Sequence, residues 1–241
     1  MFSHESAAAL WNLPVLPQMV GGVEPAPVAH VVEPWRGGGS STASLRVHSS
    51  TTAPNVVERD GRCLTSLADT VLALARDRSW VAGVAAADAA LRKRTVTREE
   101  LFERLADFRG ASGVRKASRV IAFADPRAAS AGESVSRARM HELGLAPPEL
   151  QKQFDDATGP IGLVDFWWSK QRLVGEFDGR MKYRVGGIVD YRAVEQRVWE
   201  EKRREDRLRA TGVLVTRWTW AEAMDLQRFL AHLTAAGVPR L

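Results

Sequence analysis

The sequence feature that most constrains the fold is the segment of residues 161–183, IGLVDFWWSKQRLVGEFDGRMKY, which predicts two strands joined by a short turn. Asp165 lies in the first predicted strand, and Glu176 and Asp178 lie in the second. Three carboxylates on adjacent strands repel one another, and burying them without compensation is costly. The apolar neighbours on both strands indicate partial burial, which favours a hard divalent cation such as Mg²⁺. The alternative is a set of solvated acids on edge strands.

Composition sets broad limits on the class of protein. With 241 residues, 45% of them hydrophobic, the chain can form one large or two small domains. The net charge of +5 is compatible with a polyanionic partner such as DNA. Cys63 is the only cysteine, which excludes an internal disulfide and a multi-thiolate metal site. We find no apolar run of membrane-spanning length and no signal-peptide pattern, so we expect a cytoplasmic protein without membrane contact.

The order of predicted elements divides the chain in two and predicts a mixed α/β fold. Residues 1–60 read as an irregular β region and residues 64–124 as a helical region. After residue 130 we expect a mixed sheet flanked by helices, because a meander is followed by a helix and a further strand. The expected elements there are a helix from 131 to 143, strands at 151–156, 161–168 and 172–177, a helix at 191–210, a strand at 213–215 and a helix at 220–236.

Two capping boxes are predicted at helix N-termini. Thr97 and Glu100 form the first, and Ser130 and Glu133 form the second. Glu133 can therefore serve as the capping residue of its helix. That role competes with metal binding for the same carboxylate.

The second half of the chain resembles the very-short-patch-repair-like endonuclease domain of the PD-(D/E)XK nuclease superfamily. The resemblance covers residues 130–241, and a segment near the N-terminus resembles AbiEi-type antitoxin-like regulators, in which it follows a winged helix. This implies that residues 1–125 are an AbiEi-like region that lacks the winged helix. The residues that carry the resemblance are Ser3 to Ala8, Glu133, Ser134, Arg137, Pro148 to Gln151, Val164 to Phe166, Leu173 to Gly179, Glu201, Arg204, Leu208, Gly212, Arg217 and Trp218.

The resemblance implies a Mg²⁺- or Mn²⁺-dependent endodeoxyribonuclease, a hydrolase. Asp165 and Glu176 would bind the metal, with Glu133 joining directly or through water. The superfamily expects Glu-x-Lys, but here Asp178 stands two residues after Glu176. Asp178 is then a further ligand or a base for the attacking water, and Lys182 either supplies the missing cation or is a solvated loop residue.

Basic residues near the predicted site indicate nucleic-acid contact or structural pairing. Arg204 can hold a phosphate or clamp Glu176, and Lys202 and Arg217 are further candidates for binding DNA. Trp167 and Trp168 alternate in a strand, so only one of them can face a given side of the sheet. The outward one is available for base stacking, although packing against a helix is the alternative.

Two other functions remain open from the sequence. The first is a non-catalytic, nucleic-acid-binding regulator of the AbiEi antitoxin type, favoured by the unusual Glu-x-Asp. The second is an interaction module with solvated acids. The five histidines are scattered without helical spacing, which argues against zinc.

Overall fold

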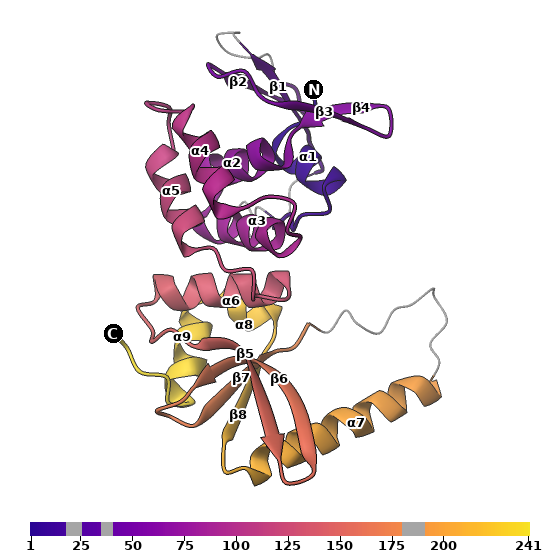
Figure 1. Ribbon diagram of the computed structural model, residues 1–241, viewed down its shortest axis with the longest axis vertical. Coiled ribbons are helices and arrows are strands. Elements are labelled where there is room, and N and C mark those ends of the chain that lie inside the picture. The colour runs from indigo at the N-terminus through magenta and orange to yellow at the C-terminus, as the bar shows by residue number, and fades with distance from the viewer. Residues whose placement is uncertain (18–25, 35–40, 180–190) are drawn as a thin grey trace. The chain divides into compact units, whose positions relative to one another are not determined.

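The computed structural model describes residues 1–17, 26–34, 41–179 and 191–241, without the side chains of residues 191–194 and 197–198 (Figure 1). The chain forms two compact units, Met1–Pro126 and Arg127–Leu241. It is mixed α/β, which confirms the predicted fold class. None of the described helices is long and apolar enough to cross a membrane.

The first unit combines short strands with a group of helices (Figure 1). Strands β1 and β2 pair in parallel, and β3 and β4 form an antiparallel hairpin. Phe2 bridges both pairs through Val31 and Leu64. The elements of this unit are α1 (His4–Leu10), β1 (Ala29–Pro34), β2 (Leu45–Ser50), β3 (Val56–Arg59), β4 (Arg62–Thr65), α2 (Leu67–Asp77), α3 (Trp80–Arg92), α4 (Arg98–Ala106) and α5 (Val114–Phe123).

Side-chain caps fix where these helices begin. The Ser66 and Ser79 hydroxyls accept backbone N–H groups at the start of α2 and α3. The predicted capping box of Thr97 and Glu100 is present at α4. Helices α2 and α3 pack closely, since a Cβ at Gly83 of α3 would lie 3.1 Å from Cα of Ala75 in α2. The Ala-rich face of α3 is therefore a packing surface.

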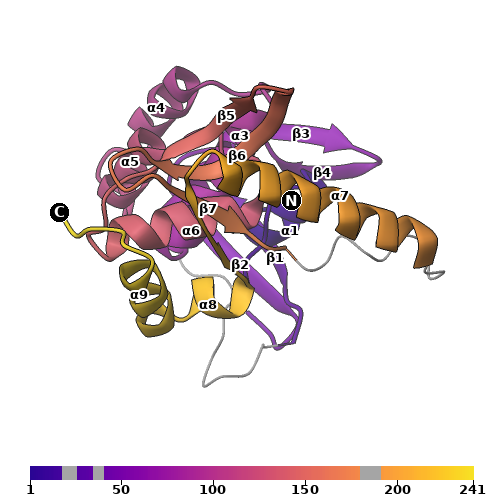
Figure 2. The same cartoon turned by 90° about the horizontal axis from the view of Figure 1, so that it is seen from below.

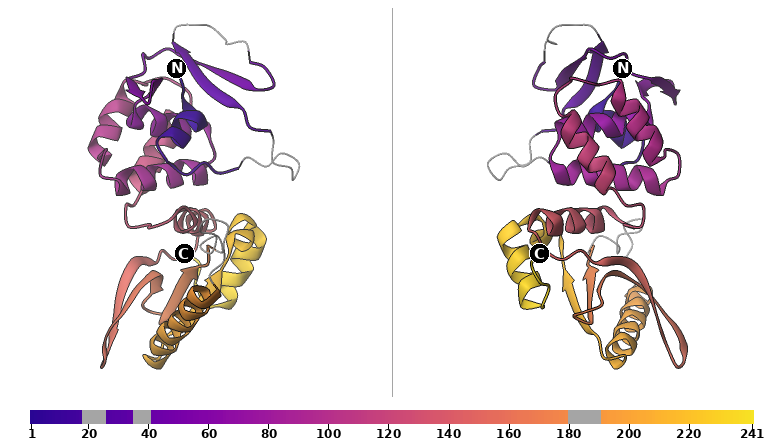
Figure 3. Two further views of the ribbon diagram at one scale, coloured as in Figure 1. Left: turned by 90° about the vertical axis from the view of Figure 1, so that its right-hand side faces the viewer. Right: turned by 60° about the vertical axis from the view of Figure 1, so that its left-hand side comes forward.

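The second unit is a four-stranded mixed sheet with helices on both faces (Figures 2 and 3). The strand order is β5-β6-β7-β8, antiparallel except for the parallel β7–β8 pair. Its elements are α6 (Ala131–Glu142), β5 (Glu149–Asp156), β6 (Gly159–Trp168), β7 (Leu173–Phe177), α7 (Tyr191–Ala210), β8 (Leu214–Trp218), α8 (Trp220–Met224) and α9 (Leu226–Ala235).

The predicted single helix at 220–236 is wrong, because two helices occupy this stretch. Asp225 adopts an extended conformation and its carboxylate accepts the N–H groups of Gln227 and Arg228. A new helix therefore begins there, as expected for an Asp N-cap.

Helices α7 and α9 cover opposite faces of the sheet (Figure 3). On the α7 side, Leu208 packs against Val164 and Val174. On the α9 side, Trp218 packs against Phe229, with ring centroids 5.5 Å apart. The α7 face carries the candidate site.

Candidate active site

Four polar residues lie at one level across the sheet, one from each strand: Gln151, Asp165, Glu176 and Arg217. We call this set the polar row. Directly opposite residues on neighbouring strands present their side chains to the same face, so the row brings its members together. The register pairs that fix it are Leu150–Phe166, Lys152–Val164, Phe166–Gly175 and Glu176–Arg217.

Asp165 is held at the point where β6 and β7 stop pairing. Its Oδ2 accepts the backbone N–H of Phe177 at 2.9 Å. Its Oδ1 accepts from Nε2 of Gln151 at 3.3 Å. The Asp165 carboxylate thus takes the place of a backbone acceptor and is fixed between two strands.

Glu133 reaches the same region from α6. Its Oε2 accepts the N–H of Ala129 at 2.8 Å and Nε2 of Gln151 at 2.9 Å. The Ser130 hydroxyl caps the helix as predicted, but the reciprocal half of the predicted capping box is replaced by the bond to Ala129. The carboxylate of Glu133 thus reaches Gln151 of the polar row while it stays in contact with the start of its own helix.

Gln151 connects the acids through an unusual backbone conformation. It has a φ of +53°, a region that non-glycine residues rarely adopt and that is enriched at functional sites. Its side-chain amide donates to both Glu133 and Asp165. The two orientations of such an amide are set by its surroundings, so rotation would present Oε1, a hard oxygen ligand, to a cation between these acids.

Glu176 is paired with a cation from α7. Nη2 of Arg204 lies 3.1 Å from Oε1 of Glu176. The same guanidinium forms two bonds to Glu201, which also accepts from Arg217. Arg204 therefore clamps Glu176, one of the two roles expected from the sequence, and also pairs with Glu201.

The pKa values of the acids differ according to how far neighbouring arginines offset the effect of burial. Burial, reinforced by the charge of Asp165, raises the pKa of Glu133 above its usual range and that of Glu176 to about 7. Burial also opposes ionisation of Glu201, but hydrogen bonds from Arg204 and Arg217 outweigh it and lower the pKa to about 2. Arg204 thus only partly offsets the repulsion between Asp165 and Glu176.

This imbalance predicts a pH dependence of stability. In the metal-free folded state the pKa of Glu176 is about 7, against an ordinary value of 4.5, so between these values the folded state binds more protons than the unfolded state. Stability contributed by protonated Glu176 is present at low pH and falls as pH rises through this window. We expect Glu176→Gln to be more stable than the native chain by about 1–3 kcal/mol at about pH 8 and similar to it at about pH 5. Urea unfolding in EDTA measures this, and a difference that does not change with pH would contradict it.

Carboxylate oxygens are the ligands that a hard cation prefers. The distances between these oxygens, however, require a rearrangement before all three acids can bind one ion. Asp165 and Glu176 share a face, which excludes the arrangement in which they point to opposite sides of the sheet. In the described part of the chain, however, three acids do not come within 4.8 Å of one another at this site. An ion held by Asp165, Glu176 and Glu133 together therefore needs a side-chain rotation or a bridging water.

The remaining predicted site residues are less closely associated with the acids. Asp178 follows β7 and is exposed. Lys182 lies outside the described residues. Arg217 pairs with Glu201 and Glu205. Lys202 lies 5.5 Å from the ring of Trp199, which is 57% exposed.

The aromatic residues are arranged as the strand alternation predicts. Trp168 is buried, whereas Trp167 lies on the other face and packs against Phe154. Trp167 is therefore partly covered. The more exposed tryptophan is Trp199, which was not among the predicted site residues. A large aromatic residue within a highly charged helix could have indicated that it faces solvent.

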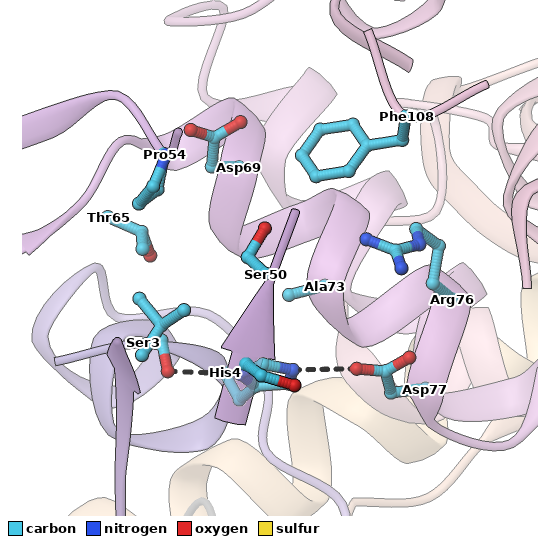
Figure 4. A pocket seen from close by; sticks show the side chains of 12 residues that line it. Ser3, His4, Ser50, Pro54, Thr65, Asp69, Ala73, Arg76, Asp77 and Phe108 are labelled. Carbon is cyan, nitrogen blue, oxygen red and sulfur yellow. Dashed lines mark hydrogen bonds and ion pairs between the residues drawn. The ribbon is translucent and has the colours of Figure 1, made fainter. Parts of the chain in front are cut away.

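A second cluster was missed because its members are far apart in sequence. His4, His48 and Asp77 converge in the first unit. His4 and Asp77 also line a cavity there (Figure 4). The absence of helical spacing among the histidines, from which zinc was judged unlikely, did not reveal this cluster. Periodicity within one helix cannot reveal ligands contributed by a helix, a strand and another helix.

Comparison with known proteins gives relatives but no activity. No protein-family model matches the chain, and no solved structure matches it. Two uncharacterized proteins, from two strains of Mycobacterium tuberculosis, are each 36% identical to it over 137 residues. The match covers 57% of this chain and 50% of each relative, so the chain spans about half the length of the curated relatives it matches.

Proposed function

We propose that residues 127–241 form a divalent-metal-dependent endonuclease domain that hydrolyses phosphodiester bonds in DNA. Mg²⁺ or Mn²⁺ is held by Asp165 and Glu176, with Glu133 as the third acid. The observation that carries the proposal is the convergence of Asp165 and Glu176 just beyond the last β6–β7 pair, Phe166–Gly175, where burial and the charge of Asp165 raise the pKa of Glu176 to about 7. Carboxylates gathered on one face are the donor set that a hard cation prefers.

The chain's own residues position these groups. A bound divalent ion supplies Lewis-acid polarisation of the phosphate and lowers the pKa of a water molecule. The N–H of Phe177 and the amide of Gln151 fix the orientation of Asp165. Arg204 holds Oε1 of Glu176, and a bound cation would favour the ionised form of this carboxylate.

Helix α7 supplies the nucleic-acid contact in this proposal. Its exposed Trp199 and neighbouring Lys202 combine an aromatic surface with a cation, the pairing used to bind unpaired bases and backbone. Arg203 and Lys202 are both exposed on the same helix. This surface favours DNA with unstacked or mispaired bases.

We expect Trp199→Ala to weaken binding of single-stranded or mismatched DNA by about 5- to 150-fold, since a base–aromatic stack contributes roughly 1–3 kcal/mol. Fluorescence anisotropy with a labelled oligonucleotide measures this. Phe102→Ala is the matched control, because Phe102 is also an exposed aromatic residue but belongs to the first unit. Equal affinities for the two variants would exclude stacking on Trp199.

A specific observation supports a second candidate, the non-catalytic nucleic-acid-binding regulator. Arg204 already pairs with Glu176, and Gln151 donates to Glu133 and Asp165, so these acids have partners without a metal. In such a protein the domain binds DNA through its basic helix alone. Calorimetry distinguishes the two, because the regulator binds DNA in a salt-dependent way but takes up no Mg²⁺ or Mn²⁺ at the polar row.

The deciding experiment is nicking of supercoiled and mismatched DNA by the full chain with Mg²⁺, with Mn²⁺ and with EDTA. Cleavage that requires the divalent ion supports the endonuclease. DNA binding without cleavage in any of these conditions supports the regulator.

A further inference from the structure

Three residues from distant segments converge in the first unit. His4 begins α1, His48 lies in β2 and Asp77 ends α2. One ligand-type atom from each lies within 4.8 Å of the other two. Nε2 of His4 is 2.8 Å from Oδ2 of Asp77, and the His4 and His48 rings stack with centroids 3.5 Å apart. Because stacked rings cannot both direct a nitrogen lone pair at one ion, one imidazole has to turn for all three residues to bind it.

The cluster opens onto a cavity of about 50 Å³ (Figure 4). His4 and Asp77 line it together with Ser3 and Ser50. The His4 side chain is buried, whereas the Asp77 side chain is 36% exposed. The cavity is large enough for an ion with a water molecule, and Asp77 provides the route from solvent.

Neighbouring groups orient the two imidazoles. Nδ1 of His4 contacts the Ser3 hydroxyl at 3.0 Å, so that Nε2 faces Asp77. Nε2 of His48 lies 2.9 Å from Nδ1 of His30. Partners on the second ring nitrogen are typical of metal-binding histidines, because they fix the tautomer and the ring plane.

The backbone at His4 also marks this place as unusual. His4 has a φ of +46°, a strained conformation for a non-glycine residue, and is buried in that conformation.

We propose that His4, His48 and Asp77 bind one Zn²⁺ ion, which fastens α1 and β2 to the end of α2. Two imidazole nitrogens and one carboxylate oxygen suit Zn²⁺ and similar transition ions, whereas Mg²⁺ prefers oxygen ligands alone. Bonds of about 2.0–2.2 Å in a tetrahedral arrangement place ligand atoms about 3.3 Å apart. The His4–Asp77 contact therefore lengthens by roughly half an ångström, and the proton on Nε2 of His4 moves to Nδ1, where the Ser3 hydroxyl accepts it. The fourth position is left for a water molecule in the cavity.

The test is a Zn²⁺ titration of the full chain carrying Asp165→Asn, a background that weakens metal uptake at the polar row. We expect one equivalent of Zn²⁺ to bind. His48→Gln and Asp77→Asn should each weaken binding at least about 10-fold, the lower end of the effect of losing a ligand's supporting partner. His141→Gln, which removes an exposed histidine of the second unit, is the matched control.

Thermal melting in EDTA separates loss of a ligand from loss of the fold. The proposal is supported when Asp77→Asn melts like its parent without metal and loses the stabilisation that Zn²⁺ gives the parent. It is overturned when the parent binds no Zn²⁺, or when His48→Gln, Asp77→Asn and His141→Gln bind it with equal affinity. The endonuclease proposal is unaffected by either result, since it concerns the other unit and Mg²⁺.

Discussion

Asp165→Asn is expected to lower the Mg²⁺-dependent rate of DNA nicking at least about 100-fold. A catalytic metal stabilises the charge of the transition state by several kcal/mol, and this stabilisation depends on its ligands. A loss of about 2.7 kcal/mol already corresponds to a 100-fold lower rate. The substitution keeps the size of the side chain. An Asn Oδ1 can still accept the N–H of Phe177, the contact that fixes this residue at the end of the β6–β7 ladder. Activity should therefore fall through loss of charge rather than loss of the fold.

Asp155→Asn provides the matched control for this measurement. Asp155 is an exposed acid on β5, so the same change of charge occurs on the same sheet away from the polar row. Both variants are compared in single-turnover nicking, with metal uptake followed by calorimetry. Equal cleavage rates for Asp155→Asn and Asp165→Asn would remove Asp165 from the catalytic site and leave the non-catalytic regulator as the better proposal.

Much of the second unit was predictable because its signals are local. The apolar stretch at 161–168 predicted most of β6, and the helix at 191–210 was predicted with its observed bounds, Tyr191–Ala210. The break at Asp225 was missed although Asp is a preferred N-cap, because the apolar spacing continues across it. In the first unit the β3–β4 hairpin was missed despite Asp60-Gly61, a dipeptide typical of a two-residue hairpin turn.

The candidate site was predictable only as far as strand pairing could be guessed. Asp165 and Glu176 were expected to be neighbours because a tight turn joins their strands. Gln151 enters the site through the register of β5, and its role depends on a φ of +53° that no sequence pattern indicates. The histidine cluster depends on contacts between segments more than 25 residues apart, which the single sequence does not encode locally.

Trp218→Ala is expected to cost about 3–5 kcal/mol of unfolding free energy in the second unit, the usual range for truncating a buried Trp. Trp218 is 1% exposed, and its ring packs against Phe166 with centroids 5.2 Å apart. Gly175 leaves room for it, since a Cβ there would lie 2.6 Å from the indole. The indole N–H donates to the Ser136 hydroxyl at 2.8 Å, which ties β8 to α6.

The exposed Trp199 provides the matched control for Trp218→Ala. Trp199→Ala removes the same side chain from a surface where 57% of it faces solvent, and should change stability by no more than about 0.5 kcal/mol. Urea unfolding followed by circular dichroism measures both without depending on tryptophan fluorescence.

Trp218→Phe distinguishes two contributions: it keeps an aromatic ring but removes the donor to Ser136. Its loss should fall between the other two, because the hydrogen bond contributes roughly 1 kcal/mol and ring packing contributes the rest. A Trp218→Ala midpoint close to that of Trp199→Ala would mean that this aromatic cluster does not hold the sheet to α6 and α9, and that the polar row lacks the rigid support its geometry requires.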